Sequence, residues 1–362
     1  MRIVQLLPEL NEGGVERGTV ELSRELVIRG DESIVISNGG TLVSQIETDG
    51  GRHIRLDVCS KNPFTALSRM VKLRRLLKEL QPDIVHARSR VPAWLAYLAN
   101  QTLHIPFVTT VHGFNSVSPY SRIMSMGDKV ICVSGAIKTY IQKHYQTPDT
   151  KIVVIPRGID LEKFNPENLE RVFMSNFSAQ YGLNGRFVVS IVGRITQLKD
   201  LETFIRAIGI VKQTKPEVKA LIVGGVRGDK EGYFDLLNGL VRELNLSDEV
   251  VFTGSQSNVA EIYALSDVVV STSKKPESFG RSVAEAIAMN TPVIATNHGG
   301  VLDIIREGVD GYFVPVGESG ILAERMIDAS RLHCEGREYI QEHFSLRQMV
   351  DKTVAVYQEM KR

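Results

Sequence analysis

Residues 271–311 read STSKKPESFGRSVAEAIAMNTPVIATNHGGVLDIIREGVDG, and this stretch decides the fold of the half of the chain that contains it. An apolar run over residues 267–272 predicts a strand that enters a polar loop over 273–278. The pattern of residues 279–289 predicts a helix, and residues 292–296 predict the return strand. This strand–loop–helix–strand order is the repeating unit of a parallel α/β sheet.

Two carboxylates flank the start of the predicted helix. Glu277 lies in the loop, and Glu285 follows eight residues later, about two turns inside the helix at ~3.6 residues per turn. Between them, Ser278, Phe279 and Gly280 place backbone N–H groups at a helix start, where the helix dipole favours phosphate. Gly280 also lets a ligand approach the backbone closely. The pattern fits a diphosphate beside carboxylates that accept sugar hydroxyls. The alternative is two solvated glutamates on an ordinary loop and helix.

Length and composition describe a globular protein. The 362 residues predict two domains, since one domain usually takes ~100–200 residues. A net charge of +1 gives no general attraction to nucleic acid. Three scattered cysteines without a CxxC pair exclude a disulfide framework and a zinc site. Neither an apolar run of ~18 residues nor a signal-peptide core is present, so a cytoplasmic location is expected.

The first half begins with a strand, a loop, a helix and a second strand over residues 2–37. The loop carries Gly13 and Gly14 directly before the helix. Two glycines there suit the close approach of a phosphate or sugar, and a plain turn is the alternative.

A histidine and two cations follow other predicted strands. His112 lies at the end of strand 107–111, and Arg194 and Lys199 lie in the loop after strand 187–192. Ligands of open α/β sheets bind beyond the carboxyl ends of strands. His112 is therefore placed for chemistry, unless it only bonds a nearby carbonyl. The two cations suit a diphosphate leaving group, unless they are plain surface charges.

Residues 64–80 predict an amphipathic helix with an apolar face and a basic face. The apolar face consists of Leu67, Met70, Val71, Leu73, Leu76, Leu77 and Leu80, and the basic face of Arg69, Lys72, Arg74, Arg75 and Lys78. Five cations on one helix suit peripheral contact with anionic lipid head groups of a membrane surface. A solvated helix face is the alternative.

The central stretch resembles the donor-site signature of the family 4 glycosyltransferases, which are retaining enzymes of the GT-B fold. ESFG at 277–280, AEA at 284–286, PVIA at 292–295, the glycine pair at 299–300 and DGY at 310–312 carry this resemblance. The resemblance extends from residue 1 to about residue 360. It implies an α/β protein with two Rossmann-like, doubly wound domains that face a central cleft.

The resemblance also implies a division of the chain into domains. The first, acceptor-side domain is expected over residues 1–166, with helix 346–362 crossing back to it. The second, nucleotide-sugar-binding domain is expected over residues 167–345. Residues 161–183 look polar and irregular, and we interpret them as the interdomain connection.

The resemblance assigns a role to each candidate residue. His112 contacts the donor sugar near the reacting carbon, and Gly13 and Gly14 face the cleft. Arg194 and Lys199 bind the pyrophosphate. These assignments make Glu277 the partner of the sugar hydroxyls, Glu285 the partner of the ribose, and Thr253 a neighbour of the base. Two positions depart from the family pattern: Arg157 replaces an asparagine, and Asp200 replaces a glycine.

The expected reaction is a retaining hexosyl transfer from a UDP- or GDP-sugar to a glycan or glycolipid. The sequence has no Asp-x-Asp metal motif, so no metal and no cofactor are expected, and protein cations stabilise the departing diphosphate instead. No enzyme nucleophile is evident, which favours a front-face reaction.

A narrower resemblance concerns the acceptor. HARSRVPAW at 86–94, TVHG at 110–113 and PRGID at 156–160 look like bacterial lipopolysaccharide-core glycosyltransferases. Arg88, Arg90 and Arg157 would suit an acidic acceptor there, unless they pair with acidic neighbours in the chain. Two other functions stay open: a sugar-nucleotide epimerase with the same layout, and a non-catalytic Rossmann-type nucleotide-binding module.

Overall fold

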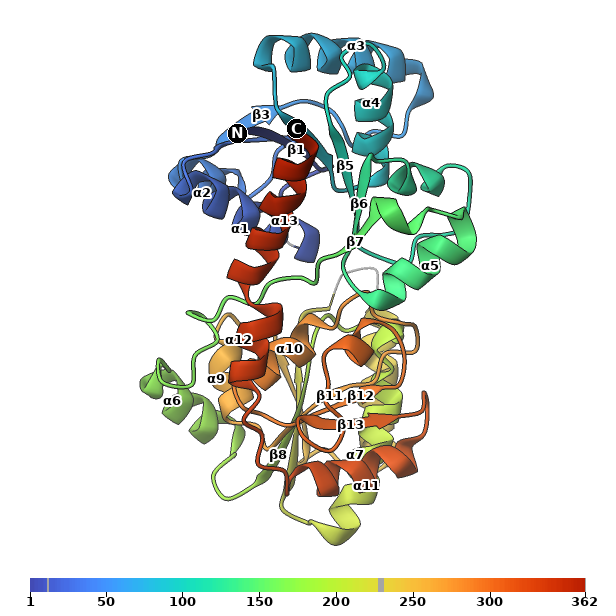
Figure 1. Ribbon diagram of the computed structural model, residues 1–362. Coiled ribbons are helices and arrows are strands. Elements are labelled where there is room, and N and C mark those ends of the chain that lie inside the picture. Colours follow the sequence, from blue (N-terminus) through green and yellow to red (C-terminus); the bar gives the residue numbers. More distant parts are fainter. Residues whose placement is uncertain (12, 227–230, 362) are drawn as a thin grey trace. The chain divides into compact units, whose positions relative to one another are not determined.

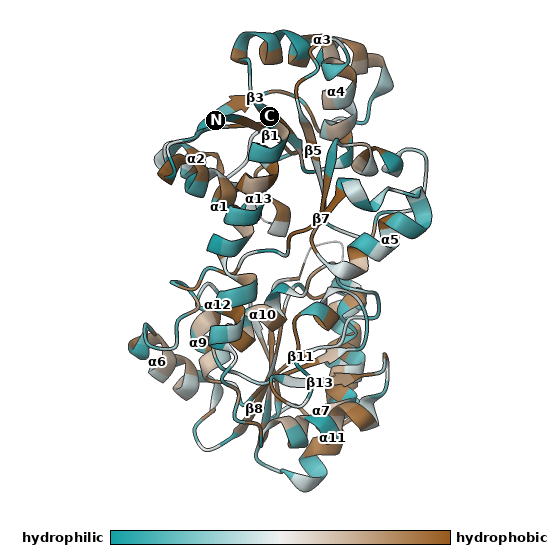
Figure 2. Cartoon of the chain, viewed as in Figure 1, coloured by the Kyte–Doolittle hydropathy of each residue, from teal (hydrophilic) through white to brown (hydrophobic). Residues whose placement is uncertain are grey.

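The chain forms two separate α/β units (Figure 1). The computed structural model describes residues 1–11, 13–226 and 231–361. Unit 1 comprises Met1–Gly158 and the chain from Leu346 onward, and unit 2 comprises Ile159–Ser345. Each unit has its own parallel sheet and its own hydrophobic clusters. Figure 2 shows hydrophobic colouring along the strands, which is typical of parallel sheets covered on both faces.

Unit 1 contains a seven-stranded sheet in the order β3-β2-β1-β4-β5-β6-β7. Its strands are β1 (Arg2–Leu6), β2 (Glu32–Ser37), β3 (Arg52–Arg55), β4 (Ile84–Ala87), β5 (Phe107–Val111), β6 (Lys129–Cys132) and β7 (Ile152–Val154). Its helices are α1 (Gly14–Ile28), α2 (Val43–Thr48), α3 (Pro63–Leu80), α4 (Arg90–Asn100), α5 (Gly135–Tyr145) and α13 (Leu346–Lys361). The strand order reverses between β1 and β4, so the loops after these strands form the usual ligand crevice of an open sheet.

Unit 2 contains a six-stranded sheet in the order β10-β9-β8-β11-β12-β13. Its strands are β8 (Phe187–Val192), β9 (Val218–Val223), β10 (Val250–Gly254), β11 (Val268–Ser271), β12 (Val293–Thr296) and β13 (Gly311–Val314). Its helices are α6 (Arg171–Tyr181), α7 (Leu201–Thr214), α8 (Glu231–Glu243), α9 (Val259–Ala264), α10 (Arg281–Ala288), α11 (Ser319–Ala329) and α12 (Arg337–Phe344). Here the order reverses between β8 and β11, whose following loops carry Lys199 and Glu277.

The last helix, α13, packs within unit 1, the unit to which the sequence expected residues 346–362 to return. Its Tyr357 is fully buried, and the hydroxyl lies 2.6 Å from Nδ1 of His86 on β4. Nε2 of His86 lies 2.6 Å from Oγ1 of Thr110 on β5. This hydrogen-bonded chain ties α13 to two adjacent strands.

The division between the units falls earlier than residue 166, where the sequence placed it. Residues 159–166 belong to unit 2. The backbone N–H of Ile159 donates to the carbonyl of Phe344 at 2.8 Å, and Phe164 packs in the same apolar cluster as Tyr263. These contacts, distant in the sequence, determine the boundary, whereas local composition does not reveal them.

The interpretation of residues 161–183 as an irregular connection is wrong for residues 171–181, which form α6. Phe173, Phe177 and Tyr181 recur every four residues and stack on one another along the helix. They pack with residues of β8 and β9 in unit 2. This aromatic stripe was the helical signal in the sequence, and the polar residues around it obscured it.

None of the helices in the described ranges combines the length and the apolar content that a bilayer crossing requires.

Candidate functional site

Glu277 is the most connected of the candidate residues in unit 2. Its Oε1 accepts from Lys199 Nζ at 2.5 Å, from Ser273 Oγ at 2.6 Å and from Ser271 Oγ at 3.4 Å. Burial alone would raise the pKa of Glu277, but the charge of Lys199 and these hydrogen bonds lower it below its ordinary value. The carboxylate is therefore ionised at neutral pH. All of these contacts use Oε1, so Oε2 remains for a ligand hydroxyl.

The two cations after β8 have different surroundings. Lys199 and Glu277 form an ion pair with side chains only 23% and 20% exposed. Arg194 is exposed, and within the described chain its side chain makes no hydrogen bond or ion pair. Lys199 pairs with Glu277 in the structure, and the joint role of Arg194 and Lys199 at a diphosphate stays a prediction. A bound diphosphate would share Lys199 with that carboxylate and would recruit Arg194 from solvent.

Asp200, which departs from the family's glycine, adopts the glycine-like conformation of that position. Its φ is 50°, in the left-handed region. Its side chain is 2% exposed, accepts from Thr203 Oγ1 at 2.8 Å and pairs with Lys274 Nζ at 3.1 Å. Aspartate tolerates this region when its side chain bonds locally. The backbone that positions Lys199 is therefore retained despite the substitution.

The helix that carries Glu285 starts later than predicted. α10 begins at Arg281, with Gly280 as its N-cap and no side-chain cap. Phe279 is 2% exposed in an apolar cluster, so its side chain faces away from any ligand and only its backbone is available. Gly280 has φ 106°, and a Cβ there would lie 2.5 Å from Val301 Cγ1. Glu285 lies about one turn inside the helix, where the sequence predicted two.

The glycine pair after β12 packs on the backbone of the Glu277 loop. The N–H of Gly300 donates to the carbonyl of Glu277 at 2.7 Å. A Cβ on Gly299 would lie 2.5 Å from that carbonyl oxygen, and a Cβ on Gly300 would lie 2.6 Å from the carbonyl oxygen of Ser278. Side chains at these positions would displace the loop, so this pair supports Glu277 and Ser278 rather than contacting ligand itself.

Two residues that the sequence did not reveal hold Glu285. Arg281 Nε donates to Glu285 Oε1 at 3.1 Å, and the hydroxyl of Tyr263 donates to Oε2 at 3.1 Å. Tyr263 is fully buried, and burial together with the Glu285 carboxylate raises its pKa well above the ordinary value, so the hydroxyl stays a donor. Glu285 is only 13% exposed and is therefore held in one orientation.

Replacing Tyr263 with Phe is expected to raise the KM for the donor about tenfold and to change kcat by less than about twofold. The reason is that a hydrogen bond to a charged group contributes ~1.5–3 kcal/mol, and here it orients the carboxylate. Steady-state kinetics at saturating acceptor measure both constants. Tyr181→Phe is the matched control, since Tyr181 contributes only ring contacts in the same unit. An unchanged donor KM in Tyr263→Phe would contradict the positioning role.

Thr253, the candidate for base binding, lies at the end of β10 and is 9% exposed. Its Oγ1 donates to the carbonyl of Gly254 at 3.1 Å, and Gln256 Nε2 donates to the carbonyl of Thr253 at 2.8 Å. The side chains thus stabilise the turn, and backbone groups are what this turn presents to a base. The role of Thr253 stays a prediction.

In unit 1, His112 has one ring nitrogen paired and the other without a partner. Arg157 NH2 lies 3.4 Å from Nδ1, and because a guanidinium only donates, Nδ1 must accept. Burial, with the charges of Arg88 and Arg157, lowers the pKa of His112 well below its ordinary value, so the ring is neutral and its proton lies on Nε2. Nε2 is buried and has no partner in the described chain. Nε2–H is therefore an unsatisfied hydrogen-bond donor that could bind an oxygen atom of a ligand.

Arg88 is a buried cation that forms no ion pair with any residue of the described ranges. It is 6% exposed, donates from NH1 to Gln5 Oε1 at 3.2 Å, and has no partner for Nε in the described chain. Burial lowers its pKa to about 10, against the smaller opposing effects of Tyr357, Glu21 and Glu16, so it stays charged at neutral pH. A buried charge without a direct ion pair is costly, and an anionic ligand would supply that pair.

Arg157 lies beside the glycine loop, whereas Arg90 points elsewhere. A Cβ on Gly14 would lie 2.7 Å from NH1 of Arg157, so the start of α1 admits this guanidinium only because Gly14 lacks a side chain. Arg90 donates to Ser121 Oγ at 3.1 Å and lies 5.5 Å from the ring centre of Tyr120. The structure therefore joins Arg157 to His112 and Gly14, and the acceptor role of Arg90 stays a prediction.

Unit 1 is expected to lose stability as the pH falls, because His86 and His112 are neutral when folded. Burial lowers the pKa of His86, as of His112, well below 6.5. The unfolded chain binds these protons below pH ~6.5, so the free energy of unfolding should fall by about 2–3 kcal/mol between pH 7 and 5.5. Urea denaturation followed through Trp94, the single tryptophan, measures this. His86→Asn should remove about half of the pH dependence, and an unchanged slope would contradict the assignment.

Among residues 1–11, 13–226 and 231–361, no group of three or more histidine, cysteine or carboxylate side chains lies together as a metal site. The three cysteines are all free thiols.

Comparison with known proteins agrees with this architecture. The sequence model described as Glycosyltransferase Family 4 matches residues 12–163, and the one described as Glycosyl transferases group 1 matches residues 174–343. The crystal structure of a glycosyltransferase from Rickettsia africae ESF-5 is 31% identical, covers 99% of this chain and 98% of that one, and has a TM-score of 0.92.

Two other proteins extend the comparison. The N-acetyl-alpha-D-glucosaminyl L-malate synthase of Bacillus anthracis is 28% identical over 80% of this chain and 78% of its own length. Anabaena HepE, solved in complex with UDP, is 21% identical with a TM-score of 0.87, over 99% of this chain and 100% of that one, and shows the same fold. The chain has two Rossmann-like parallel sheets and the Glu277 loop, and it is 31% identical along nearly its whole length to a solved glycosyltransferase. This protein is therefore a glycosyltransferase of family 4, with the GT-B fold.

Proposed function

We propose that this glycosyltransferase moves a hexosyl group from a UDP- or GDP-sugar to an acidic glycan or glycolipid, with retention of configuration and without a metal ion. The arrangement around Glu277 carries the proposal. An ionised carboxylate, a paired lysine and an uncapped helix start lie on adjacent loops of unit 2. A carboxylate can accept hydrogen bonds from sugar hydroxyls. A lysine and free N–H groups can stabilise the negative charge of a leaving diphosphate.

On the donor side, Arg194, Lys199 and the N–H groups at the start of α10 hold the diphosphate. They stabilise the negative charge that develops as the bond from the anomeric carbon to the diphosphate oxygen breaks. Glu277 Oε2 accepts from sugar hydroxyls, and Glu285 accepts from the ribose. The departing diphosphate oxygen takes the proton of the acceptor hydroxyl, which attacks the same face.

On the acceptor side, Arg88 and Arg157 bind a carboxylate or phosphate, and His112 Nε2 donates to a sugar oxygen. The buried guanidinium of Arg88, whose Nε has no partner in the described chain, supports an anionic acceptor. The Bacillus anthracis relative is named for a product that contains L-malate, a dicarboxylate, which agrees with this chemistry. A lipopolysaccharide core or another cell-envelope glycan is the acceptor that the narrower sequence resemblance favours, and the cytoplasm is the proposed location.

A two-stage assay tests the reaction. Thermal shift against UDP-, GDP- and ADP-sugars should single out one donor, because a ligand that binds the folded state raises its apparent stability. That donor is then incubated with acidic and neutral acceptors in the presence and absence of EDTA, and the product anomer is determined by NMR.

The expected result is an anomer of unchanged configuration, a preference for the acidic acceptor and no effect of EDTA. An inverted product, inhibition by EDTA or preference for the neutral acceptor would each contradict the corresponding part. Conversion of the donor to its epimer would favour the epimerase alternative, and binding without turnover the non-catalytic one.

A further inference from the structure

Helix α3 has a second apolar side that nothing in the described chain covers. Leu73 and Leu77 are fully buried in unit 1, as expected for the packed face of an amphipathic helix. Phe64 and Leu67, however, are 94% and 68% exposed. The sequence placed Leu67 on the packed face, which is wrong, because it lies about 120° around the helix from Leu73 at ~100° per residue. Packing against the unit therefore does not account for these two side chains.

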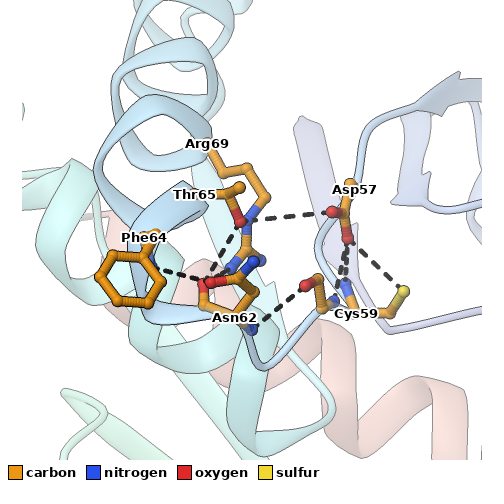
Figure 3. Close-up of polar contacts among 7 residues, drawn as sticks. Asp57, Cys59, Asn62, Phe64, Thr65 and Arg69 are labelled. Carbon is orange, nitrogen blue, oxygen red and sulfur yellow. Dashed lines mark hydrogen bonds and ion pairs between the residues drawn. The ribbon is translucent and has the colours of Figure 1, made fainter.

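Phe64 is exposed although it lies in the first turn of a helix that is capped and held by hydrogen bonds (Figure 3). Asn62 caps the helix by accepting from the N–H of Phe64 at 3.0 Å. Arg69 donates to the carbonyl of Asn62 at 3.0 Å and to Thr65 Oγ1 at 3.1 Å, and its Nε lies 3.9 Å from Asp57. In Figure 3 the Phe64 ring points away from this polar cluster. Arg69, predicted on the basic face, is 6% exposed and instead fixes the turn that presents Phe64.

The same segment is strongly basic. Between Asp57 and Glu79 the chain has six lysines and arginines and no acidic residue. Two of the cations serve the unit itself: Arg69, and Arg74, which donates to the carbonyls at the end of α4 at 3.1 and 3.2 Å. The other four are exposed and have no hydrogen bond or ion pair with the described residues. They are Lys61, Lys72, Arg75 and Lys78.

The exposed apolar and basic side chains share one side of the helix. At ~100° per residue, the exposed Phe64, Leu67, Arg75 and Lys78 and the half-buried Val71 fall within an arc of about 80° and span about 21 Å. Phe64 and Leu67 lie in the first two turns and Val71 in the third, whereas the basic residues lie beyond or beside them, except Lys61, which precedes the helix. We call the following residues the outer face of α3: Lys61, Phe64, Leu67, Val71, Lys72, Arg75 and Lys78.

We propose that the outer face of α3 docks on the surface of an anionic lipid bilayer. Phe64 and Leu67 enter the boundary between head groups and acyl chains, and the four free cations contact lipid phosphates. A second copy of the chain fits poorly, because a symmetric contact would bring two cationic faces together. A lipid surface needs no shaped pocket for Phe64 and supplies the negative charge that the segment lacks. This surface has no part in the transfer chemistry, so its test is independent of the proposed reaction.

Vesicle flotation with the full-length protein tests the docking. The protein should float with vesicles of phosphatidylglycerol and phosphatidylcholine and stay at the bottom with phosphatidylcholine alone. Phe64→Ser/Leu67→Ser should lower the partition coefficient about tenfold or more. Lys72→Gln/Arg75→Gln/Lys78→Gln should lower it about fivefold per charge, and 0.5 M salt should act like the charge variants. The matched control is Ile28→Ser, which removes a 70% exposed side chain from α1 and should change nothing.

A second readout locates the contact on the helix. Phe64→Trp should be quenched by lipids brominated near the head group, whereas wild-type Trp94 should not be. Failure of the wild type to float, or flotation that the serine variant leaves unchanged, would overturn the proposal. So would a concentration-dependent dimer in sedimentation that Phe64→Ser/Leu67→Ser abolishes, because that outcome assigns the face to a second copy. Donor turnover with a soluble acceptor should be equal in all these variants.

Discussion

Replacing Lys199 with Met is expected to lower kcat by a factor of about 10²–10³, the usual effect of removing one preorganised donor to a developing anion. The side chain also pairs with Glu277 at 2.5 Å in a largely buried setting, so its loss leaves a carboxylate without its cation. Breaking a buried pair in this way costs about 3–5 kcal/mol, and partial exposure reduces that figure to roughly 2–4 kcal/mol of unfolding free energy. Single-turnover kinetics and urea denaturation measure the two effects.

A double variant separates catalysis from stability. Lys199→Met/Glu277→Gln removes both charges and should regain most of the lost stability while remaining inactive. The ion pair contributes fully to the free energy of unfolding above pH 4.5, the ordinary pKa of Glu277. This contribution is lost as the pH falls through the lowered pKa of the folded state. The difference between wild type and Lys199→Met should therefore narrow in acid. Lys275→Met, which changes an exposed lysine of the loop that carries Glu277, is the control. Normal turnover in Lys199→Met would refute the assignment.

The sequence could predict the fold and the loops of the site because both follow from local patterns. Short apolar runs alternate with helical periodicity, and in a parallel sheet the residues after each strand share one edge. The loops of Glu277 and Lys199 follow β11 and β8, which are neighbouring strands. The proximity of these two loops could therefore be predicted from the sequence alone.

The direction of individual side chains could not be predicted. Lys199 pairs with Glu277 across 78 positions, and Tyr263 donates to Glu285 across 22. These contacts depend on strand register and on the left-handed backbone at Asp200, neither of which is visible in composition. Phe279 shows the same limit: it sits inside the signature, yet its side chain belongs to the core.

Replacing Arg88 with Met is expected to raise the KM for an acidic acceptor about 10²–10³-fold and to leave donor affinity within about twofold. The guanidinium is buried and charged and lacks a carboxylate partner in the described chain, so it would bind an anion strongly. Removing one member of a buried charge pair typically costs ~2–5 kcal/mol of binding. Initial rates at varied acceptor, and donor titration by calorimetry, measure the two constants. Arg122→Met changes an exposed arginine of the same unit and should have no effect.

Arg88→Met should weaken acceptor binding but raise the free energy of unfolding. This combination distinguishes a binding role of Arg88 from a structural one. Arg88 donates to Gln5, so the comparison is made in a Gln5→Leu background, where that hydrogen bond is already absent. In this background Arg88→Met removes a buried charge that forms no ion pair with the described residues, and it should raise the free energy of unfolding by about 1–4 kcal/mol. Urea denaturation followed through Trp94 measures the difference between Gln5→Leu and Gln5→Leu/Arg88→Met. If the double variant unfolds more readily than Gln5→Leu alone, Arg88 serves the core of unit 1, and the acidic-acceptor proposal loses its principal support.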